Sequence, residues 1–164
     1  MFRDDKTTTK CRIVFDASAR EGDGLSLNDC VLPGPALQPG LASVLIRFRT
    51  HRIGLIADIE KMFLEVKLAP EDRDVHRYPW RDLQFNETPK VYIIQRLTSG
   101  VNSSPFLAVS TVHGHAKKYT ELFPNAVQEI LQNMYVNGVL TGADTVDSYE
   151  TSTRFVRDHD ESGV

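Results

Sequence analysis

A carboxylate stands at the end of an apolar run in the middle of the chain. The run 53–57, Ile-Gly-Leu-Ile-Ala, has the length of a buried strand and leads directly into Asp58. A strand that ends in an aspartate carries a negative charge to the edge of a sheet, where metal and phosphate chemistry is often done. Aspartate is also a favoured N-cap residue, so Asp58 could instead begin a short helix from Ile59 to Phe63. Spacing alone leaves both interpretations open.

Composition indicates a folded domain of ordinary size. The chain has 164 residues, 41% of them hydrophobic and 25% charged, which is enough to bury a substantial core. No apolar run approaches the roughly 20 residues that cross a bilayer, and the N-terminus does not have the pattern of a signal peptide. Cys11 and Cys30 have neither metal nor disulfide spacing, so we expect an intracellular, cytoplasmic protein without a membrane partner. The net charge of −3 lacks the basic excess of a free-standing nucleic-acid-binding protein.

Hydrophobic spacing and turn residues predict helices interleaved with short strands. The Asn137-Gly138 pair lies between two short apolar runs and predicts a hairpin with a type I′ turn, in which both residues have positive φ. A second hairpin is predicted around the polar loop after Arg81. The pattern predicts an α+β fold, with helices on one face of an antiparallel sheet. The expected helices lie near 41–48, 104–116, 126–134 and 146–156, and the expected strands near 7–16, 53–57, 66–68, 77–81, 90–97, 134–136 and 139–140.

Four blocks of sequence together carry a family resemblance. They are Arg12-Ile13-Val14-Phe15-Asp16-Ala17-Ser18 with Ser26-Leu27-Asn28-Asp29; Ala57-Asp58-Ile59-Glu60-Lys61-Met62-Phe63; Gly100-Val101-Asn102-Ser103-Ser104-Pro105-Phe106-Leu107-Ala108; and Tyr135-Val136-Asn137-Gly138-Val139-Leu140-Thr141-Gly142-Ala143-Asp144-Thr145. In this order and at this spacing they resemble the reverse-transcriptase domain of BEL/Pao-type LTR retrotransposons. The resemblance implies the fingers and palm of a polymerase right hand over residues 1–157, with an antiparallel palm sheet and a polar tail at 158–164.

The resemblance also implies roles for single residues. Asp58 matches the first catalytic aspartate, which binds both Mg²⁺ ions. The backbone from Ile59 onward would lie against the triphosphate of the incoming deoxynucleotide, and Phe63 matches the aromatic gate against a ribose 2′-OH. The implied activity is RNA-directed DNA polymerisation, a nucleotidyl transfer on a primer–template.

The fingers and the third block supply the remaining nucleotide contacts implied by the resemblance. Lys10 and Arg12 look like the residues that meet the triphosphate, Lys as a point charge and Arg through its planar fork. Gly100 lies in the turn that supports the nucleotide, where a glycine permits close approach of the backbone. We therefore expect Lys10, Arg12, Asp58, Phe63 and Gly100 to line one cleft, with the Tyr135–Leu140 hairpin tip opposite Asp58.

The fourth block departs from the family pattern. The family has Tyr-Val-Asp-Asp, whereas this chain has Tyr135-Val136-Asn137-Gly138. Two-metal catalysis needs ions roughly 3.5–4 Å apart, and Mg²⁺ requires hard anionic oxygens. Asn137 and Gly138 stand where the lost aspartates would be, which leaves Asp58 as the retained half of an incomplete metal site. We expect a catalytically inactive fragment, and we expect replacement of both residues by aspartate to cost the turn some stability.

The sequence leaves two classes of function open. In the first, the chain is a decayed reverse-transcriptase fragment in which the thumb, ribonuclease H and integrase segments are missing. Such a fragment would bind an RNA or DNA primer–template and deoxynucleotide weakly, although its ancestral element would be particle-associated. In the second, the retained surface is a co-opted, non-catalytic module that binds nucleic acid or protein. Tyr78 and Trp80 fit either base stacking or core packing.

Overall fold

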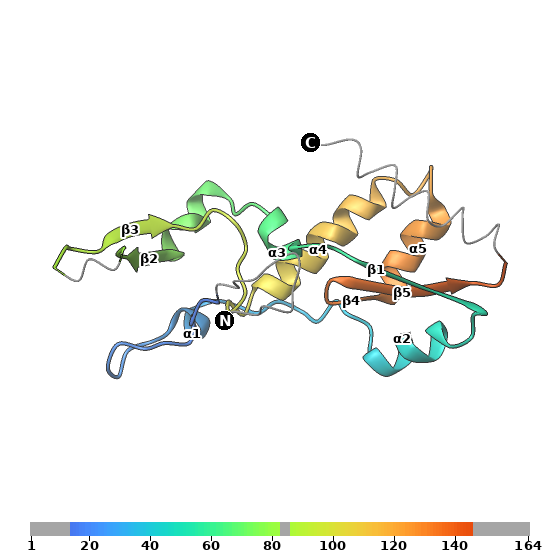
Figure 1. Cartoon of the computed structure of the whole chain (residues 1–164), viewed down its shortest axis with the longest axis horizontal. Helices are drawn as coiled ribbons and strands as arrows, with labels where there is room; N and C mark the ends of the chain where they lie inside the picture. The colour runs from blue at the N-terminus through green and yellow to red at the C-terminus, as the bar shows by residue number, and fades with distance from the viewer. Residues whose placement is uncertain (1–13, 83–85, 146–164) are drawn as a thin grey trace. The chain divides into compact units, whose positions relative to one another are not determined.

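The computed structural model describes residues 14–82 and 86–145. These residues divide into two compact units, the first comprising 14–34, 61–82 and 86–108 and the second comprising 35–60 and 109–145. The helical elements are α1 (Leu27–Cys30), α2 (Leu41–Phe48), α3 (Met62–Glu65), the 3₁₀ helix η1 (Pro70–Val75), α4 (Ser104–Lys117) and α5 (Pro124–Asn133); the strands are β1 (Ile53–Asp58), β2 (Arg77–Trp80), β3 (Lys90–Ile93), β4 (Met134–Tyr135) and β5 (Gly138–Ala143) (Figure 1).

The second unit contains a three-stranded antiparallel sheet in the order β1-β5-β4. Burial alternates along β1, where Gly54, Ile56 and Asp58 are exposed and the residues between them are half-buried. Alternation with a period of two is the pattern of a strand that has one face against a core. The apolar run before Asp58 therefore forms the predicted strand, but it occupies the edge of the sheet.

A chain of polar contacts fastens α5 and α2 to this sheet. The Glu129 carboxylate accepts hydrogen bonds from the Thr141 hydroxyl and the Asn133 amide, both at 2.5 Å. Arg47 Nε donates to Asn133 Oδ1 at 2.7 Å, and its guanidinium also donates to the Gln132 carbonyl. Asn133 and Thr141 are buried, so these bonds compensate for the loss of water from their polar groups.

The face of the sheet that does not contact α5 is closely packed near the start of β1. A Cβ at Gly54 would lie 2.8 Å from Cζ of Phe48, and a Cβ at Gly142 would lie 2.4 Å from Cβ of His51. Gly54 and Gly142 are cross-strand partners, and they are glycines because no side chain fits beneath the end of α2. The α+β class is confirmed, with the difference that the end of α2 covers part of the face opposite α5.

The first unit contains the second predicted hairpin. Strands β2 and β3 pair antiparallel, with Arg77 opposite Ile93 and Trp80 opposite Lys90. The expected strand over 66–68 does not join the sheet of β1, because Lys67 instead makes an isolated antiparallel bridge with Arg96.

Several predictions for the two ends of the chain fall outside the described residues. The expected helix near 146–156 and the polar tail at 158–164 lie outside the described residues, as does most of the expected strand at 7–16. Of that strand the structure describes only its end, where the Phe15 N–H donates to the Ser99 carbonyl at 3.3 Å. The assignment of residues 1–157 to a single fingers–palm domain stays a prediction.

Candidate functional site

Asp58 is the last residue of β1, directly across from the β4–β5 hairpin. Its cross-strand partner is Gly138, and the next N–H along the chain, that of Ile59, donates to the Asn137 carbonyl at 2.9 Å. Asp58 is exposed, while Asn137 and Gly138 are half-buried. The structure thus brings together Asp58, Ile59 and the two positions at which the family pattern has aspartates.

The helix-cap interpretation of Asp58 is wrong. Helix α3 begins at Met62, and its N-cap residue is Lys61, which has φ 50° in the left-handed region. No helix starts directly after Asp58, because Ile59 extends the pairing with the hairpin for one further hydrogen bond. The Asp58 side chain is therefore not used to begin a helix.

The hairpin turn differs from the one expected. Tyr135 pairs with Gly138, so the two loop residues are Val136 and Asn137, and Gly138 is already part of β5. Val136 has φ 57°, whereas neither Asn137 nor Gly138 is among the positive-φ residues. The predicted type I′ turn at Asn137-Gly138 is wrong because the pairing register, anchored by β1 against β5, places the turn one residue earlier. A β-branched residue at positive φ is a strained conformation, which costs on the order of 1–3 kcal/mol.

The oxygen donors at this end of the sheet do not suit a pair of Mg²⁺ ions. Asp58 supplies one carboxylate, Asn137 supplies a neutral amide, and Gly138 has no side chain. Across residues 14–82 and 86–145, no three His, Cys, Asp or Glu side chains are grouped so that they could hold a metal ion. A two-metal site requires more anionic oxygen than this set provides.

The other predicted site residues lie either in the first unit or outside the described residues. Phe63 is half-buried and, like Gly100, belongs to the first unit, whereas Asp58 belongs to the second. Lys10 and Arg12 lie outside the described residues. The expected cleft shared by all five residues stays a prediction.

Gly100 occupies a position that only glycine can take. Its φ is +108°, and a Cβ added there would lie 2.0 Å from the backbone oxygen of Phe15. Both the left-handed conformation and the contact exclude a side chain. Gly100 thus allows the backbone to approach the segment around Phe15 closely, and its expected approach to a nucleotide stays a prediction.

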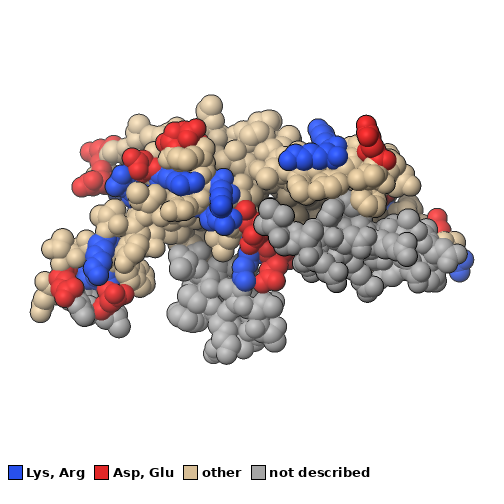
Figure 2. Space-filling view, turned by 90° about the horizontal axis from the view of Figure 1, so that it is seen from above, with Lys and Arg blue, Asp and Glu red and all other residues tan. Residues whose placement is uncertain are grey.

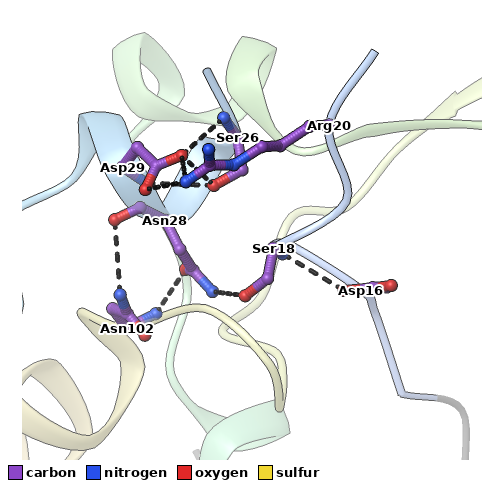
Figure 3. A network of polar contacts seen from close by, with 7 residues as sticks. All are labelled: Asp16, Ser18, Arg20, Ser26, Asn28, Asp29 and Asn102. Atoms are coloured by element: carbon purple, nitrogen blue, oxygen red, sulfur yellow. Dashed lines mark hydrogen bonds and ion pairs between the residues drawn. The ribbon is translucent and has the colours of Figure 1, made fainter. Parts of the chain in front are cut away.

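Asn28 ties this turn to the first block (Figure 3). Its Nδ2 donates to Ser18 Oγ and to the Gly100 carbonyl, both at 2.9 Å, and its Oδ1 accepts from the Asn102 N–H at 2.8 Å. The amide thus makes three hydrogen bonds to two other segments of the first unit, one at Ser18 and one at Gly100 and Asn102. Asn28 belongs to the first sequence block, which predicted no role for it. The only signal in the sequence was that its block and the Gly100 block resemble the same family, and this carries no information about contact.

A capping box presents Asn28 to these partners. The Ser26 side chain caps α1, and Asp29 accepts from the Ser26 N–H at 2.9 Å. Arg20 pairs with the same carboxylate at 2.9 Å. The bond from the Ser26 backbone is the main cause that lowers the pKa of Asp29, followed by the Ser26 hydroxyl, with Arg20 contributing less.

The β2–β3 hairpin of the first unit carries the aromatic side chains Tyr78, Trp80 and Tyr92, here called the aromatic ribbon. Tyr78 stacks on Tyr92 with ring centroids 5.8 Å apart, and Phe15 meets the edge of Tyr78 at 5.3 Å. Trp80 is 53% exposed and Tyr92 is 43% exposed, so these rings are not buried in a core. The core-packing interpretation of Trp80 is wrong, because a two-stranded ribbon leaves its side chain in water.

Charged side chains of both signs share the visible surface. Figure 2 shows Lys and Arg interspersed with Asp and Glu among the described residues of this face, without a continuous basic stripe. In the first unit, Arg77 pairs with Asp74 at 2.8 Å. An electrostatic footprint for a phosphate backbone is therefore not visible on this face. Among the described residues, no helix is long and apolar enough to cross a membrane.

Comparison with known proteins indicates the class to which the chain is related. It is similar to part of a retroviral polyprotein, which supports an origin in a retroelement polyprotein. The relative is the Gag-Pro-Pol polyprotein of Squirrel monkey retrovirus, 28% identical over 124 residues, or 75% of this chain. The matched part spans 6% of that polyprotein's length. No family model matches the chain.

Proposed function

We propose that the chain is the fingers-and-palm part of a retroelement reverse transcriptase of BEL/Pao type that no longer extends primers. By descent it is an RNA-directed DNA polymerase acting on a primer–template and deoxynucleotides. The similarity to a retroviral polyprotein supports the retroelement origin. The reverse-transcriptase identity rests on the four sequence blocks and on the geometry at Asp58.

One observation carries the proposal. The strand that ends in Asp58 pairs with β5 in the register that puts Gly138 directly across from it, and the Asn137 carbonyl accepts from the following N–H at 2.9 Å. Residues about 80 positions apart in the chain are thereby neighbours at the end of the sheet where β1 finishes. Carboxylates at positions 58 and 138 would lie directly opposite each other on one face of the sheet, with position 137 next to them in the loop, and polymerase chemistry needs acids that share metal ions in this way.

The loss of activity follows from the side chains that occupy this edge. Removal of one well-placed electrostatic group typically slows catalysis about 10²–10³-fold. Here two anionic ligands are replaced by an amide and a hydrogen atom, so the metal pair has one carboxylate where three would be needed. Under this proposal Lys10 and Arg12 would still meet a triphosphate, and Phe63 and Gly100 would still shape the nucleotide pocket.

Primer extension tests the proposal directly. We expect no extension by the wild-type chain with Mg²⁺ or Mn²⁺, and none by Asp58→Ala. Extension by the wild type that disappears in Asp58→Ala would overturn the inactivity. Recovery of extension by Asn137→Asp with Gly138→Asp, and its loss again when Asp58→Ala is added, would establish the polymerase ancestry of this edge.

Filter binding and fluorescence anisotropy test the nucleic-acid part of the proposal. We expect weak binding to an RNA–DNA primer–template, without sequence preference, that falls steeply as salt rises. The 22 acidic residues oppose the phosphate backbone, and they outnumber the 19 lysines and arginines. Tight binding at physiological salt would contradict a decayed enzyme.

The exposed aromatic ribbon favours a second candidate, a co-opted binding module. Trp80 and Tyr92 present ring surface to solvent, and aromatic rings stack on unpaired bases of any sequence. Under this candidate Trp80→Ala would weaken binding to single-stranded RNA about tenfold, since stacking is worth about 1–3 kcal/mol per base. Leu122→Ala is a matched control, because Leu122 is a 72% exposed apolar residue of the second unit.

A further inference from the structure

The outer edge of β1 is the side of the strand that faces away from β5. Within the described residues β1 pairs with β5 on one side and with no strand on the other. Five of its six residues, Ile-Gly-Leu-Ile-Ala, are uncharged, and the strand contains no proline or lysine. Natural proteins protect edge strands with proline, with lysine or other charged residues, with bulges or with a covering helix or loop, because an open edge is a template for pairing with another strand.

The hydrogen bond at Ile59 fixes which backbone groups face outward. Its N–H points to β5, since it donates to the Asn137 carbonyl. Backbone groups alternate along a strand, so Ala57 and Leu55 also face β5, whereas Asp58, Ile56 and Gly54 direct their N–H and C=O groups to the open edge. The same three residues are exposed, and Ile56 has 70% of its surface in water.

We propose that this edge pairs with the same edge of a second copy of the chain, giving a two-fold dimer with one continuous antiparallel sheet. A strand that pairs antiparallel with its own copy makes an isologous contact, which closes as a dimer. Each outward-facing residue must meet an outward-facing residue for their hydrogen bonds to form. Only registers that pair even-numbered positions with even-numbered positions satisfy this condition.

Charge selects one of these registers. With the two-fold axis at Leu55, Gly54 pairs with Ile56 of the second copy, and Arg52 faces Asp58 of the second copy. Arg52 and Asp58 are both exposed and flank the apolar run at its two ends. Opposite charges directly across a strand pair are favourable, and the two-fold axis forms this pair twice. A shift of two residues either way separates Arg52 from Asp58 of the second copy.

The side chains also fit in this register. Directly opposed residues share a face of the sheet, so Ile56 would lie beside Gly54 of the second copy, which has no side chain of its own, and next to the Phe48 ring that covers this glycine. The Phe48 ring lies beneath that glycine, 2.8 Å from the position of an added Cβ. The exposed isoleucine would therefore exchange water for an apolar contact.

Sedimentation velocity of the whole chain over a range of micromolar concentrations tests the dimer. We expect a concentration-dependent monomer–dimer equilibrium in the wild type, and a dissociation constant at least about tenfold higher in Ile56→Lys, because a charged side chain at an edge blocks pairing. The matched control is Ile46→Lys, since Ile46 is 67% exposed on α2 in the same unit. This control should leave the equilibrium unchanged. Far-ultraviolet circular dichroism checks that each variant is folded.

A charge-swap experiment tests the register. Arg52→Asp and Asp58→Arg should each weaken self-association at least about tenfold, because two attractive pairs become two repulsive ones. An equimolar mixture of the two variants should dimerise like the wild type, since it restores both opposite-charge pairs. Failure of the mixture to associate would overturn the register. A monomer at every concentration, or a dimer that Ile56→Lys does not weaken, would overturn the proposal and leave the edge to a strand from elsewhere in a longer chain.

Discussion

Two regions are held together by different kinds of chemical group. They are the end of the sheet at Asp58, here the Asp58 edge, and the contact of Asn28 with the Gly100 turn, here the Asn28–Gly100 junction. At the Asp58 edge the contacts run through backbone groups, such as the bond from Ile59 N–H to the Asn137 carbonyl. At the junction they run through a side chain, since the Asn28 amide makes three hydrogen bonds to two other segments. One region keeps its geometry whatever the side chains are, and the other depends on a single residue type.

Under the proposed function, this difference explains how the fold would persist after loss of the ancestral chemistry. Side chains at positions 58, 137 and 138 contribute little to the pairing of β1 with β5, so aspartate can be replaced there without unfolding. Gly138 has ordinary contacts for an added Cβ, the nearest being 3.6 Å from the Ala57 carbonyl. Asn28 and Gly100 have no such freedom, because their replacement removes contacts or creates a clash.

The largest effect is expected for Gly100→Ala. The new Cβ would meet the Phe15 carbonyl at 2.0 Å in a backbone conformation that alanine rarely adopts. We expect the free energy of unfolding to fall by about 3 kcal/mol or more, measured by urea denaturation. Gly114→Ala is the matched control, since nothing lies within 4 Å of its added Cβ in α4. The free energy of unfolding of this control should rise by about 0.5–1 kcal/mol. Equal effects in the two variants would show that the clash with Phe15 does not set the cost at Gly100.

Asn28→Ala is expected to cost somewhat less. It removes the donor to the Gly100 carbonyl and the acceptor of the Asn102 N–H, and such bonds contribute about 0.5–1.5 kcal/mol each. We expect a loss of about 2 kcal/mol in urea denaturation. Asn125→Ala, at an exposed position of α5, should change stability by less than about 0.5 kcal/mol. A loss at Asn28 no larger than at Asn125 would show that the junction does not depend on the amide.

A smaller effect is expected at the Asp58 edge. Asn137→Asp with Gly138→Asp should lower the unfolding free energy by about 1 kcal/mol without divalent ions, because like charges then face each other across the strands. The earlier expectation of a cost to the turn falls away, since Gly138 does not have positive φ. Mg²⁺ should restore the loss by binding the folded state. The wild type should show no Mg²⁺ dependence, and a double variant insensitive to Mg²⁺ would argue against a shared metal position.

The smallest effect is expected in acid, at Asp29. Its pKa is lowered from 3.8, mainly by the Ser26 N–H, so the folded chain holds the ionised form more firmly than the unfolded chain does. The contribution to stability is therefore complete above pH 3.8 and is lost as the pH falls through the lower, folded pKa. Carboxyl titration by NMR should give a value below 3.8. In Asp29→Asn this part of the acid dependence should disappear, and its persistence would assign it to other carboxylates.

Local patterns in the sequence were sufficient for several elements. An apolar run of strand length predicted the strand that ends at Asp58, and helical spacing predicted α2 at Leu41–Phe48. Turn residues and β-rich runs predicted the pairing of β2 with β3. These features depend on neighbours within a few residues, which a sequence displays directly.

The hairpin shows where local patterns fail. Asn137-Gly138 is a favourable type I′ pair by itself, yet Val136 takes the positive φ instead. Pairing of six consecutive residues between β1 and β5 sets the register, and this outweighs the preference of two turn residues. The cap interpretation of Asp58 failed for the same reason, since pairing continues to Ile59.

What the sequence by itself determined is most of the larger helices and strands of the described residues, the α+β class and the identity of the donor atoms near position 58. Only the tertiary structure decided which of these residues meet. Asp58 faces Gly138, and Asn28 holds Gly100, across separations of about 70 to 80 residues. Such contacts arise from strand pairing and hydrogen bonding between distant segments. Their energies depend on how the whole unit packs, and no local window of sequence contains them.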